Sequence, residues 1–337
     1  MNEVFFPATK HSSLGNEFLV CLLTEDDAKE DVAAGTAEGT ADVPPVEEAH
    51  RYFENLRLQG KWNADGLVLA WEDEAALEDA REAATFAASP KDPIIVGGNP
   101  AGPYLAVHMR LFNSDGSEAE TSGNGLCCLG QVLANRYPNI THFLVETAGR
   151  WEDVRVQSDT SEDGLSVQIS TTMGIPLLGF AGSEQQRKAT EAGASFRNNE
   201  ALFVSVGNPH VVVMMDDIGS VNPSEDGPRF IADFGEEVNV EFVSYNSESE
   251  ELDMKVWERG VGETQACGSG AVASVVALSH WKGGKIKAEQ KDATPQIYED
   301  VKVNMAGGSA LVRRYYRSFL PMLYIAEVKY LGEYDPA

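Results

Sequence analysis

Cysteine is scarce in this chain, and the few cysteines do not form a metal-binding or disulfide pattern. The 337 residues include four, Cys21, Cys127, Cys128 and Cys267, with no CxxC or Cys/His spacing among them. Such spacing marks structural zinc sites and the frameworks of disulfide-rich secreted domains. The sequence therefore predicts no metal site, and its free thiols suit a reducing compartment.

Basic residues are also few compared with acidic ones. The chain has 26 Lys and Arg against 53 Asp and Glu, a formal net charge of −27. A surface of this sign repels nucleic acid and anionic lipid, so we expect neither as a partner. Much of the acid lies in segments that look inserted, at 24–48, 72–92 and 183–200. We interpret these segments as solvated faces without chemistry.

Long hydrophobic runs are absent as well. No apolar run approaches the length of a membrane span, and residues 1–10 lack a charged region followed by a long apolar core. We therefore expect a cytoplasmic protein with no membrane partner. Hydrophobic residues make up 43% of the chain, enough to bury a large core, and the length fits two domains.

What the sequence does contain is a polar, glycine-rich turn followed by a long apolar run at 254–281. Cys267 stands directly before Gly268-Ser269-Gly270, and the small apolar residues that follow predict a buried helix. Free backbone N–H groups and the helix dipole favour a thiolate at such a terminus, so we expect the thiol pKa, ordinarily about 8.5, to move towards neutrality. A free cysteine is more often a small core residue. The polar residues before Cys267 and the glycines after it favour a reactive thiol here.

A second stretch, 107–130, repeats this plan. It passes from a strand through a polar turn to Ser122, which is followed by GNG and another apolar run. Glu258 lies nine positions before Cys267, and Asn113 lies nine positions before Ser122. This repetition indicates a duplicated unit.

The repetition extends upstream, where LGN at 14–16 resembles VGN at 206–208. The pattern predicts an α+β fold of two similar domains, each with strands wrapped around one long helix and with a cleft between the domains. We expect domain boundaries at 1–150 and 151–310, with 311–337 as closing strands that return to the N-terminal domain.

The second half is expected to follow a simple order of elements. The segment 202–215 leads through a turn to 238–246, the segment 252–260 follows, and the buried helix comes after Cys267. Strands at 297–305 and 309–318 then form a hairpin around Gly307-Gly308.

These motifs resemble those of diaminopimelate epimerase and the wider family of amino-acid epimerases and racemases that work without pyridoxal phosphate. The matching segments appear in family order between about residues 10 and 312: SLGNEF, ADGLVL, RLFNSDGSEAE with SGNG, MGIP, VGNPHVV, VNVEFV and WERGVGETQACGSGA. The resemblance implies two pseudo-symmetric domains, each a curled, mainly antiparallel sheet around a central helix. It also implies an active site between the two helix N-termini and catalysis without a cofactor.

The resemblance further implies an acid/base site with two sides. Inversion at an α-carbon needs a base on one face and an acid on the other. Family members place one cysteine on each side; here Cys267 takes one side, and Ser122 stands where the other cysteine is expected. A serine hydroxyl normally needs a neighbouring base, so we expect slowed epimerisation. Cys127 and Cys128 lie within the next helix and are not expected to replace the missing thiol.

The remaining site residues are carried over from the resemblance by motif. Glu258 is expected beside the substrate amine and Arg259 on its distal carboxylate, although such a dipeptide more often forms a surface pair. His210 is expected to support the acid/base pair. Four asparagines, which alone would be ordinary turn residues, are expected to bind substrate: Asn16, Asn113, Asn208 and Asn239. Four residues at the helix starts are expected to supply backbone N–H groups: Gly123, Asn124, Gly268 and Ser269.

Three functions fit these residues. The first is epimerisation of LL- to meso-diaminopimelate, a step in making lysine and peptidoglycan precursors, which the distal-site residues Asn113, Asn239 and Arg259 favour. The second is a relative with one thiol base, such as an isomerase, racemase or dehydratase of another amino acid. The third is a non-catalytic amino-acid-binding paralogue, which only Ser122 supports. In each case the partner is a small-molecule amino acid, and a homodimer is left open.

Overall fold

The structure, a computed structural model, describes residues 6–23, 46–73, 76, 104–159, 165–179, 183–282, 298–315 and 321–336. These residues fall into two compact units. The first comprises Met1–Thr121, Gly125–Ile169 and Glu327–Ala337, and the second comprises Ser122–Asn124 and Ser170–Ala326. The expected domain boundaries at 150 and 310 stay a prediction. Most of the acidic segments 24–48 and 72–92 lies outside the described residues.

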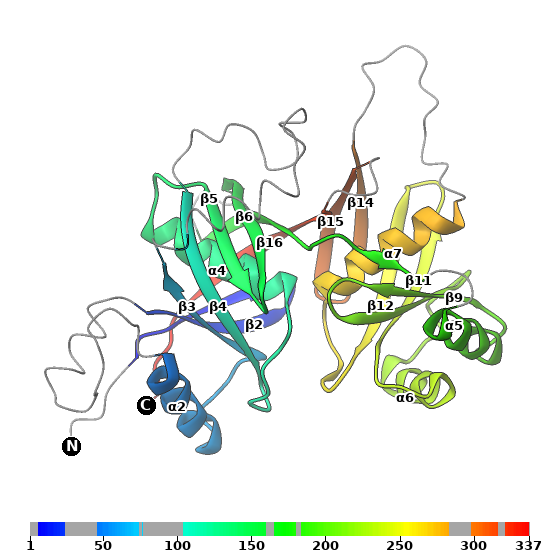
Figure 1. Ribbon diagram of the computed structural model, residues 1–337, viewed down its shortest axis with the longest axis horizontal. Helices are drawn as coiled ribbons and strands as arrows, with labels where there is room; N and C mark the ends of the chain where they lie inside the picture. The colour runs from blue at the N-terminus through cyan, green and yellow to red at the C-terminus, as the bar shows by residue number, and fades with distance from the viewer. Residues whose placement is uncertain are drawn as a thin grey trace, which may run out of the picture. The chain divides into compact units, whose positions relative to one another are not determined.

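The sheet of the first unit closes on itself. Its strands follow the order β1 (Thr9–Ser13), β2 (Asn16–Leu23), β3 (Gly66–Glu72), β4 (Tyr104–Asn113), β5 (His142–Thr147), β6 (Arg150–Asp159), β7 (Ser166–Thr172) and β16 (Leu323–Glu333). β16 pairs antiparallel with β1, which completes the ring. Helix α4 (Gly123–Arg136) runs inside these strands, and helix α2 (Val46–Leu58) covers their outside (Figure 1).

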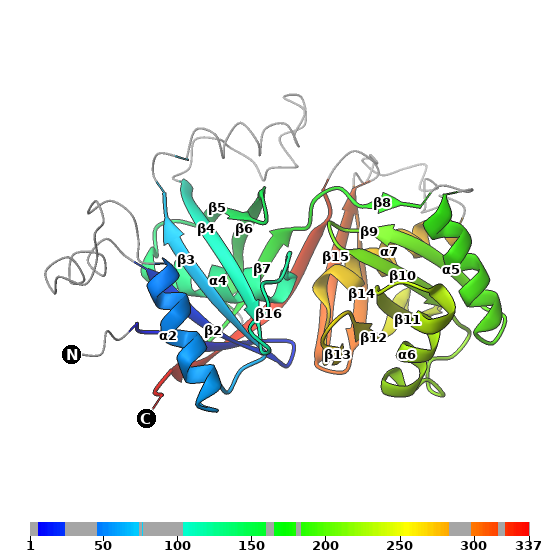
Figure 2. The same cartoon turned by 60° about the horizontal axis from the view of Figure 1, so that its bottom comes forward.

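The second unit is built on a similar sheet. From β16 its order is β15 (Gly308–Tyr315), β14 (Tyr298–Met305), β12 (Glu251–Glu258), β11 (Asn239–Asn246), β10 (Pro209–Met214), β9 (Glu200–Ser205) and β8 (Leu177–Leu178), and β13 (Gly262–Glu263) pairs with β12. Helix α7 (Gly268–Trp281) contacts β9, β10, β11 and β15. Helices α5 (Glu184–Ser195) and α6 (Pro223–Phe234) lie side by side outside this sheet (Figure 2).

The two units repeat one order of strands and helices. β1 to β6 pair in turn as antiparallel, parallel, antiparallel, parallel and antiparallel neighbours. The series β9, β10, β11, β12, β14 and β15 repeats that alternation. α2 and α6 occupy one equivalent position, and α4 and α7 the other. The α+β expectation of two similar units, mainly antiparallel and each around a central helix, is confirmed.

The central helix of the second unit is buried because its sequence has no polar face. Residues 268–279 are small or apolar, and all but Val276 are buried. A helix that is apolar on every side is stable only inside a protein. Its first residue is therefore held firmly by the surrounding strands.

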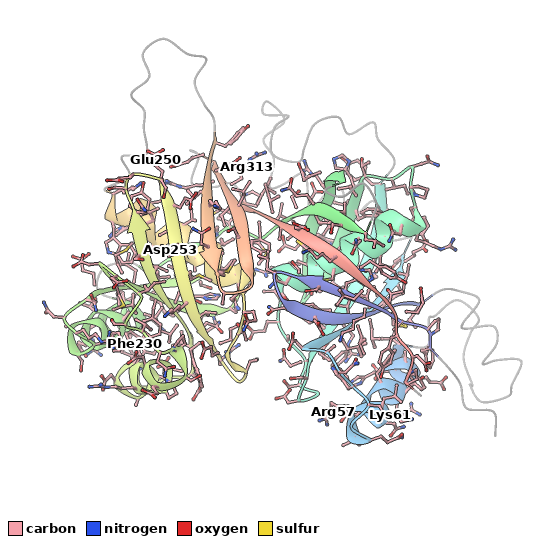
Figure 3. All side chains as sticks on the ribbon, turned by 180° about the vertical axis from the view of Figure 1, so that it is seen from behind. Arg57, Lys61, Phe230, Glu250, Asp253 and Arg313 are labelled. Atoms are coloured by element: carbon pink, nitrogen blue, oxygen red, sulfur yellow. The ribbon has the colours of Figure 1, made fainter. Side chains whose placement is uncertain are left out.

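Two expectations for the second half are corrected. The region after β10, expected as a turn, contains α6, which begins at Pro223 and has Glu225 and Asp226 in its first turn. Phe230 of this helix is fully buried in the core of the unit and is labelled in Figure 3. Segment 183–200 was read as a solvated face, but α5 places Ala189 in the same core. Both helices use an apolar face to cover the sheet.

Candidate active site

Cys267 caps the N-terminus of α7. Its φ of −130° and ψ of 113° are extended, and its Sγ accepts a hydrogen bond from the backbone N–H of Gly270 over 3.3 Å. The Ser269 hydroxyl lies 3.5 Å from the same sulfur. The thiol is buried, with 4% of the residue exposed. The expected helix start at Cys267 is thus present, and the sulfur faces donors.

The environment of the thiol is more complex than a helix terminus alone. Burial raises the pKa of Cys267 well above its usual value, and the carboxylates of Glu258 and Glu241 raise it further. Hydrogen bonds with Ser269 and from Gly270 act in the opposite direction. The expectation of a thiol brought towards neutrality is wrong, because desolvation and two nearby carboxylates outweigh the helix N-terminus. Formation of the thiolate therefore needs an acceptor for its proton.

Glu258, the last residue of β12, is placed to interact with that proton. Its carboxyl group accepts a hydrogen bond from Thr264 and interacts with the Cys267 thiol. Burial raises the pKa of Glu258, and the charge of Glu241 adds to this, whereas the hydrogen bonds of Thr264 and Cys267 lower it. A carboxyl group with a raised pKa is a better proton acceptor near neutral pH. Glu258 thus interacts directly with the Cys267 thiol. This contact adds to the role expected for Glu258 beside the substrate amine.

The starts of α4 and α7 meet at one aromatic side chain. A Cβ atom built on Gly268 would lie 3.2 Å from Gly123 Cα and 3.2 Å from the ring of Tyr324. A Cβ atom on Gly123 would lie 3.0 Å from the same ring and 3.3 Å from Met173 Sδ. Only glycine allows two helix N-termini to approach this closely. The first-turn N–H groups of both helices are thereby brought to one place.

Asn124 fixes the first turn of α4 in this position. Its side-chain oxygen accepts a hydrogen bond from Tyr324 over 2.7 Å, and its side-chain nitrogen donates to the Ala266 carbonyl over 3.3 Å. Ser122, the residue before α4, is partly exposed and belongs to the same compact unit as Cys267. The structure therefore places Ser122 just before one helix start and Cys267 just before the other.

His210 lies behind these helix starts and is fully buried. Its Nδ1 is 2.7 Å from Oε1 of Glu241, and its Nε2 is 2.9 Å from Oδ1 of Asn208. The side-chain nitrogen of Asn208 donates to the Ser269 hydroxyl over 3.3 Å. Glu241 was not expected in the site, although a lone charge in the apolar strand VNVEFV was a signal for it.

Asn239, next to His210 and Glu241, links the start of β10 to the end of β12. Its side-chain nitrogen donates to the Pro209 carbonyl over 2.9 Å, and its oxygen accepts from the Arg259 backbone N–H over 2.9 Å. These bonds hold the turn after β12, on which Arg259 is exposed. A role for Asn239 and Arg259 on a substrate stays a prediction.

Two of the expected asparagines belong to the first unit. Asn16 begins β2, opposite Ser13 of β1. Asn113 ends β4, and its side-chain nitrogen donates to the Ser117 hydroxyl over 3.0 Å. Their places at strand ends follow the sequence expectation, and their contact with a substrate stays a prediction.

Cys127 and Cys128 lie inside α4 and are fully buried in the first unit. The thiol of Cys127 points to the Ile169 carbonyl at 3.8 Å, and burial raises the pKa of Cys128 well above its usual value. Their contacts are those of core residues. Among the residues that the structure describes, no group of three or more His, Cys, Asp and Glu is placed to hold a metal, and no helix is long and apolar enough to cross a membrane.

Comparison with known proteins identifies the family. The sequence profile of diaminopimelate epimerase matches residues 202–312. A diaminopimelate epimerase from Bacillus licheniformis is 37% identical over 217 residues, which cover 61% of this chain and 70% of that protein. The chain belongs to the diaminopimelate epimerase family. It is therefore an isomerase, and the expected family is confirmed.

A second relative and a solved structure are also similar to this chain. The diaminopimelate epimerase of Geobacillus thermodenitrificans is 42% identical over 180 residues, which cover 51% of this chain and 61% of that protein. The solved structure of a PhzF-family phenazine biosynthesis protein from Bacillus anthracis has a TM-score of 0.58 at 14% identity and covers 97% of both chains. At that identity the likeness concerns the fold.

Proposed function

We propose that this member of the family epimerises LL-diaminopimelate to meso-diaminopimelate at one α-carbon, without a cofactor. The observation that carries the proposal is the meeting of two helix N-termini at Gly123 and Gly268, with Cys267 capping one helix and Ser122 preceding the other. The names of the related proteins supply the substrate. Such a site offers donors for a carboxylate and one candidate base.

The first step is removal of the α-proton by the Cys267 thiolate. The thiol loses its own proton to Glu258, whose raised pKa suits it to accept one. The thiolate then takes the α-proton and leaves a carbanion whose charge spreads into the α-carboxylate. General-base catalysis of this kind contributes typically ~10² to 10⁴-fold.

The helix starts stabilise that developing charge. First-turn N–H groups point out of a helix end, and those of Gly123, Asn124, Gly268 and Ser269 are proposed to donate to the substrate carboxylate. Donors fixed in advance where charge develops lower the barrier more than mobile water does. The absence of side chains at Gly123 and Gly268 supports this close approach.

The distal end of the substrate carries its own amine and carboxylate. Arg259 is proposed for that carboxylate, since a guanidinium binds a carboxylate with two parallel hydrogen bonds. The bonds of Asn239 to Pro209 and to the Arg259 backbone support a role in holding the arginine turn. Asn16, Asn113 and Asn208 are proposed as further donors and acceptors.

Ser122 is proposed to face the opposite side of the α-carbon. A hydroxyl group does not ionise near neutral pH, so it can pass a proton only with the help of a base or water. Proton return at that face is then slow compared with return by Cys267. We expect exchange of the α-hydrogen to run ahead of inversion.

The test is hydrogen exchange in deuterated water, followed by NMR and by chiral analysis of each diaminopimelate isomer. One isomer should exchange its α-hydrogen with retained configuration, because Cys267 returns a solvent-derived deuteron to the same face. The other isomer should exchange far more slowly, and inversion should lag behind exchange. Equal exchange from both isomers would contradict the one-thiol scheme. No exchange despite measurable binding would indicate a binding protein instead.

A further inference from the structure

An unbroken series of side-chain contacts leads from β11 to the sulfur of Cys267. It passes from Glu241 to His210 over 2.7 Å, to Asn208 over 2.9 Å, to Ser269 over 3.3 Å and to Cys267 over 3.5 Å. Glu241 and His210 are both fully buried. We refer to these five residues as the relay.

The relay has a direction. Nε2 of His210 faces Oδ1 of Asn208, an amide oxygen that only accepts, so Nε2 acts as the donor. Its Nδ1 faces Oε1 of Glu241. The amide group of Asn208 then presents its nitrogen to Ser269, and the Ser269 hydroxyl is left to donate to the sulfur. From Nε2 of His210 onwards, each donor therefore points towards Cys267.

We propose that Glu241 is a positioning residue that holds His210 as the first donor of this relay and thereby favours the thiolate of Cys267. The proposal rests on the proposed function in taking Cys267 as the base. Glu241 touches no substrate in this scheme and acts through three intervening side chains. It differs in this from Glu258, which interacts with the thiol itself.

The strand around Glu241 shows why this carboxylate is unusual. It lies on β11, with Val240 and Phe242 fully buried on either side. Its Oε1 would lie 2.7 Å from a Cβ built on Gly270, so it sits directly under the first turn of α7. Among the described residues its Oε2 atom has no hydrogen-bond partner. A buried carboxylate costs folding free energy, and the contact with His210 is the compensation that the structure provides.

Two carboxylates act directly on the sulfur, and their effects oppose the relay. Glu258 on β12 and Glu241 on β11 both raise the pKa of Cys267 through space. His210 on β10 contacts Glu241 on the far side of the relay. Removing the charge of Glu241 should therefore favour the thiolate if only the through-space effect matters. It should disfavour the thiolate if the relay dominates.

This difference in sign makes a sharp experiment. The rate of Cys267 alkylation by iodoacetamide is measured against pH by peptide mass spectrometry in the wild-type chain, Glu241→Gln and the exposed control Glu200→Gln. We expect Glu241→Gln to slow alkylation at pH 7 about tenfold, as expected for loss of a hydrogen bond to a charged group. Glu200→Gln should leave the rate unchanged. Faster alkylation in Glu241→Gln would overturn the proposal.

A double-variant cycle distinguishes an effect transmitted through the relay from a general disturbance of the structure. Ser269→Ala cuts the relay next to the sulfur, so adding Glu241→Gln to it should produce no further slowing. If the two effects simply multiply, Glu241 acts by another route and the proposal fails. Circular dichroism and thermal unfolding verify that each variant is folded.

A measurement on the unaltered protein covers the case in which Glu241→Gln does not fold. Nitrogen-15 NMR of histidine-labelled protein reports the protonation of both His210 nitrogens, with the His210 signals assigned by their absence from His210→Gln. A protonated Nε2 at the pH where Cys267 alkylates is expected, and a bare Nε2 would overturn the proposal. None of these readouts uses diaminopimelate, so failure of the relay and failure of the proposed reaction remain distinguishable.

Discussion

The hydroxyl group of Tyr324 donates a hydrogen bond to the side chain of Asn124 over 2.7 Å, which ties β16 to the first turn of α4. Tyr324 is fully buried, and its ring also contacts the positions of Gly123 and Gly268. One side chain therefore sets both the spacing and the orientation of the two helix starts.

Tyr324→Phe keeps the ring and removes the hydroxyl. We expect the free energy of unfolding to fall by about 1 kcal/mol, the usual net value of one internal hydrogen bond. Urea unfolding measures it. Tyr330→Phe is the matched control, because that hydroxyl group bonds Glu333 at an exposed site. An equal effect of the two changes would show that the Asn124 bond has no special weight.

Gly268→Ala should damage the site directly. The new methyl group would lie 3.2 Å from Gly123 Cα, and a backbone atom cannot move aside as a flexible side chain can. We expect about 1–3 kcal/mol of destabilisation, typical of overpacking, and a large loss of substrate binding measured by calorimetry. In Gly219→Ala the three atoms nearest to the methyl group would all belong to the flexible side chain of Asp217, so that variant should behave as wild type.

Ser122→Cys should raise epimerisation by ~10² to 10⁴-fold, because it supplies an ionisable group on the second face. Steady-state rates with LL-diaminopimelate, read by chiral chromatography, give the ratio. Ser249→Cys, at an exposed turn, controls for the mere addition of a thiol. A wild-type chain that already turns over at ~10 per second, a common value for enzymes, and gains nothing from the change would show that Ser122 or another group serves that face.

Cys267 should be the first cysteine to react with an alkylating agent. It is 4% exposed, whereas Cys21, Cys127 and Cys128 are each 0% exposed. Reactivity follows access and thiolate character, and a bound diaminopimelate should protect the thiol. Mass spectrometry of peptides from partly labelled protein gives the order. Earlier labelling of Cys127 or Cys128 would place the reactive site elsewhere.

His11 should make the stability of the first unit depend on pH. It is buried between Gln131 and Thr9, and burial lowers its pKa below the usual 6.5, with Gln131 and Glu333 partly offsetting this. Both states carry a neutral imidazole above pH 6.5. As the pH falls below that value the unfolded chain takes up the proton first, so stability is lost progressively until the folded-state pKa is passed.

Urea unfolding between pH 8 and pH 5, compared with His11→Gln, measures this contribution. The loss of stability on acidification should be smaller in the variant, because glutamine does not titrate. Equal slopes for the two proteins would show that His11 takes up its proton equally readily in the folded and unfolded chains.

The helix after Cys267 could be predicted because its signal is local. An unbroken run of small apolar residues behind a polar turn fixes both the helix and its buried position, and the capping of α7 by Cys267 follows. The repetition of SGNG and CGSG likewise predicted the equivalent positions of α4 and α7. Because the family is confirmed, these motifs are features of a single family.

Features that depend on tertiary contact were missed. α6 was hidden by Gly227 and Pro228 in its interior, although Asn222 before Pro223 and the acidic first turn are ordinary signs of a helix start. Burial raises the pKa of the Cys267 thiol most, followed by Glu258 and then Glu241. Glu241 lies 26 positions away in sequence and approaches only through the packing of α7 over β11. A single sequence does not show which charges fold towards a thiol.

The position of β16 in the sequence determines when the sheet of the first unit can close. It follows every other described strand in sequence, yet it pairs with β1, from Thr9 opposite Glu333 to Ser13 opposite Val328. While the ribosome makes the residues between β7 and β16, the edge strands β1 and β7 of the first sheet both lack β16, the strand that pairs with them. At 5–20 residues per second this lasts on the order of ten seconds. Open strand edges attract other strands, so the nascent chain is most exposed to mispairing in that interval, and the first unit can close only after the second has been synthesised.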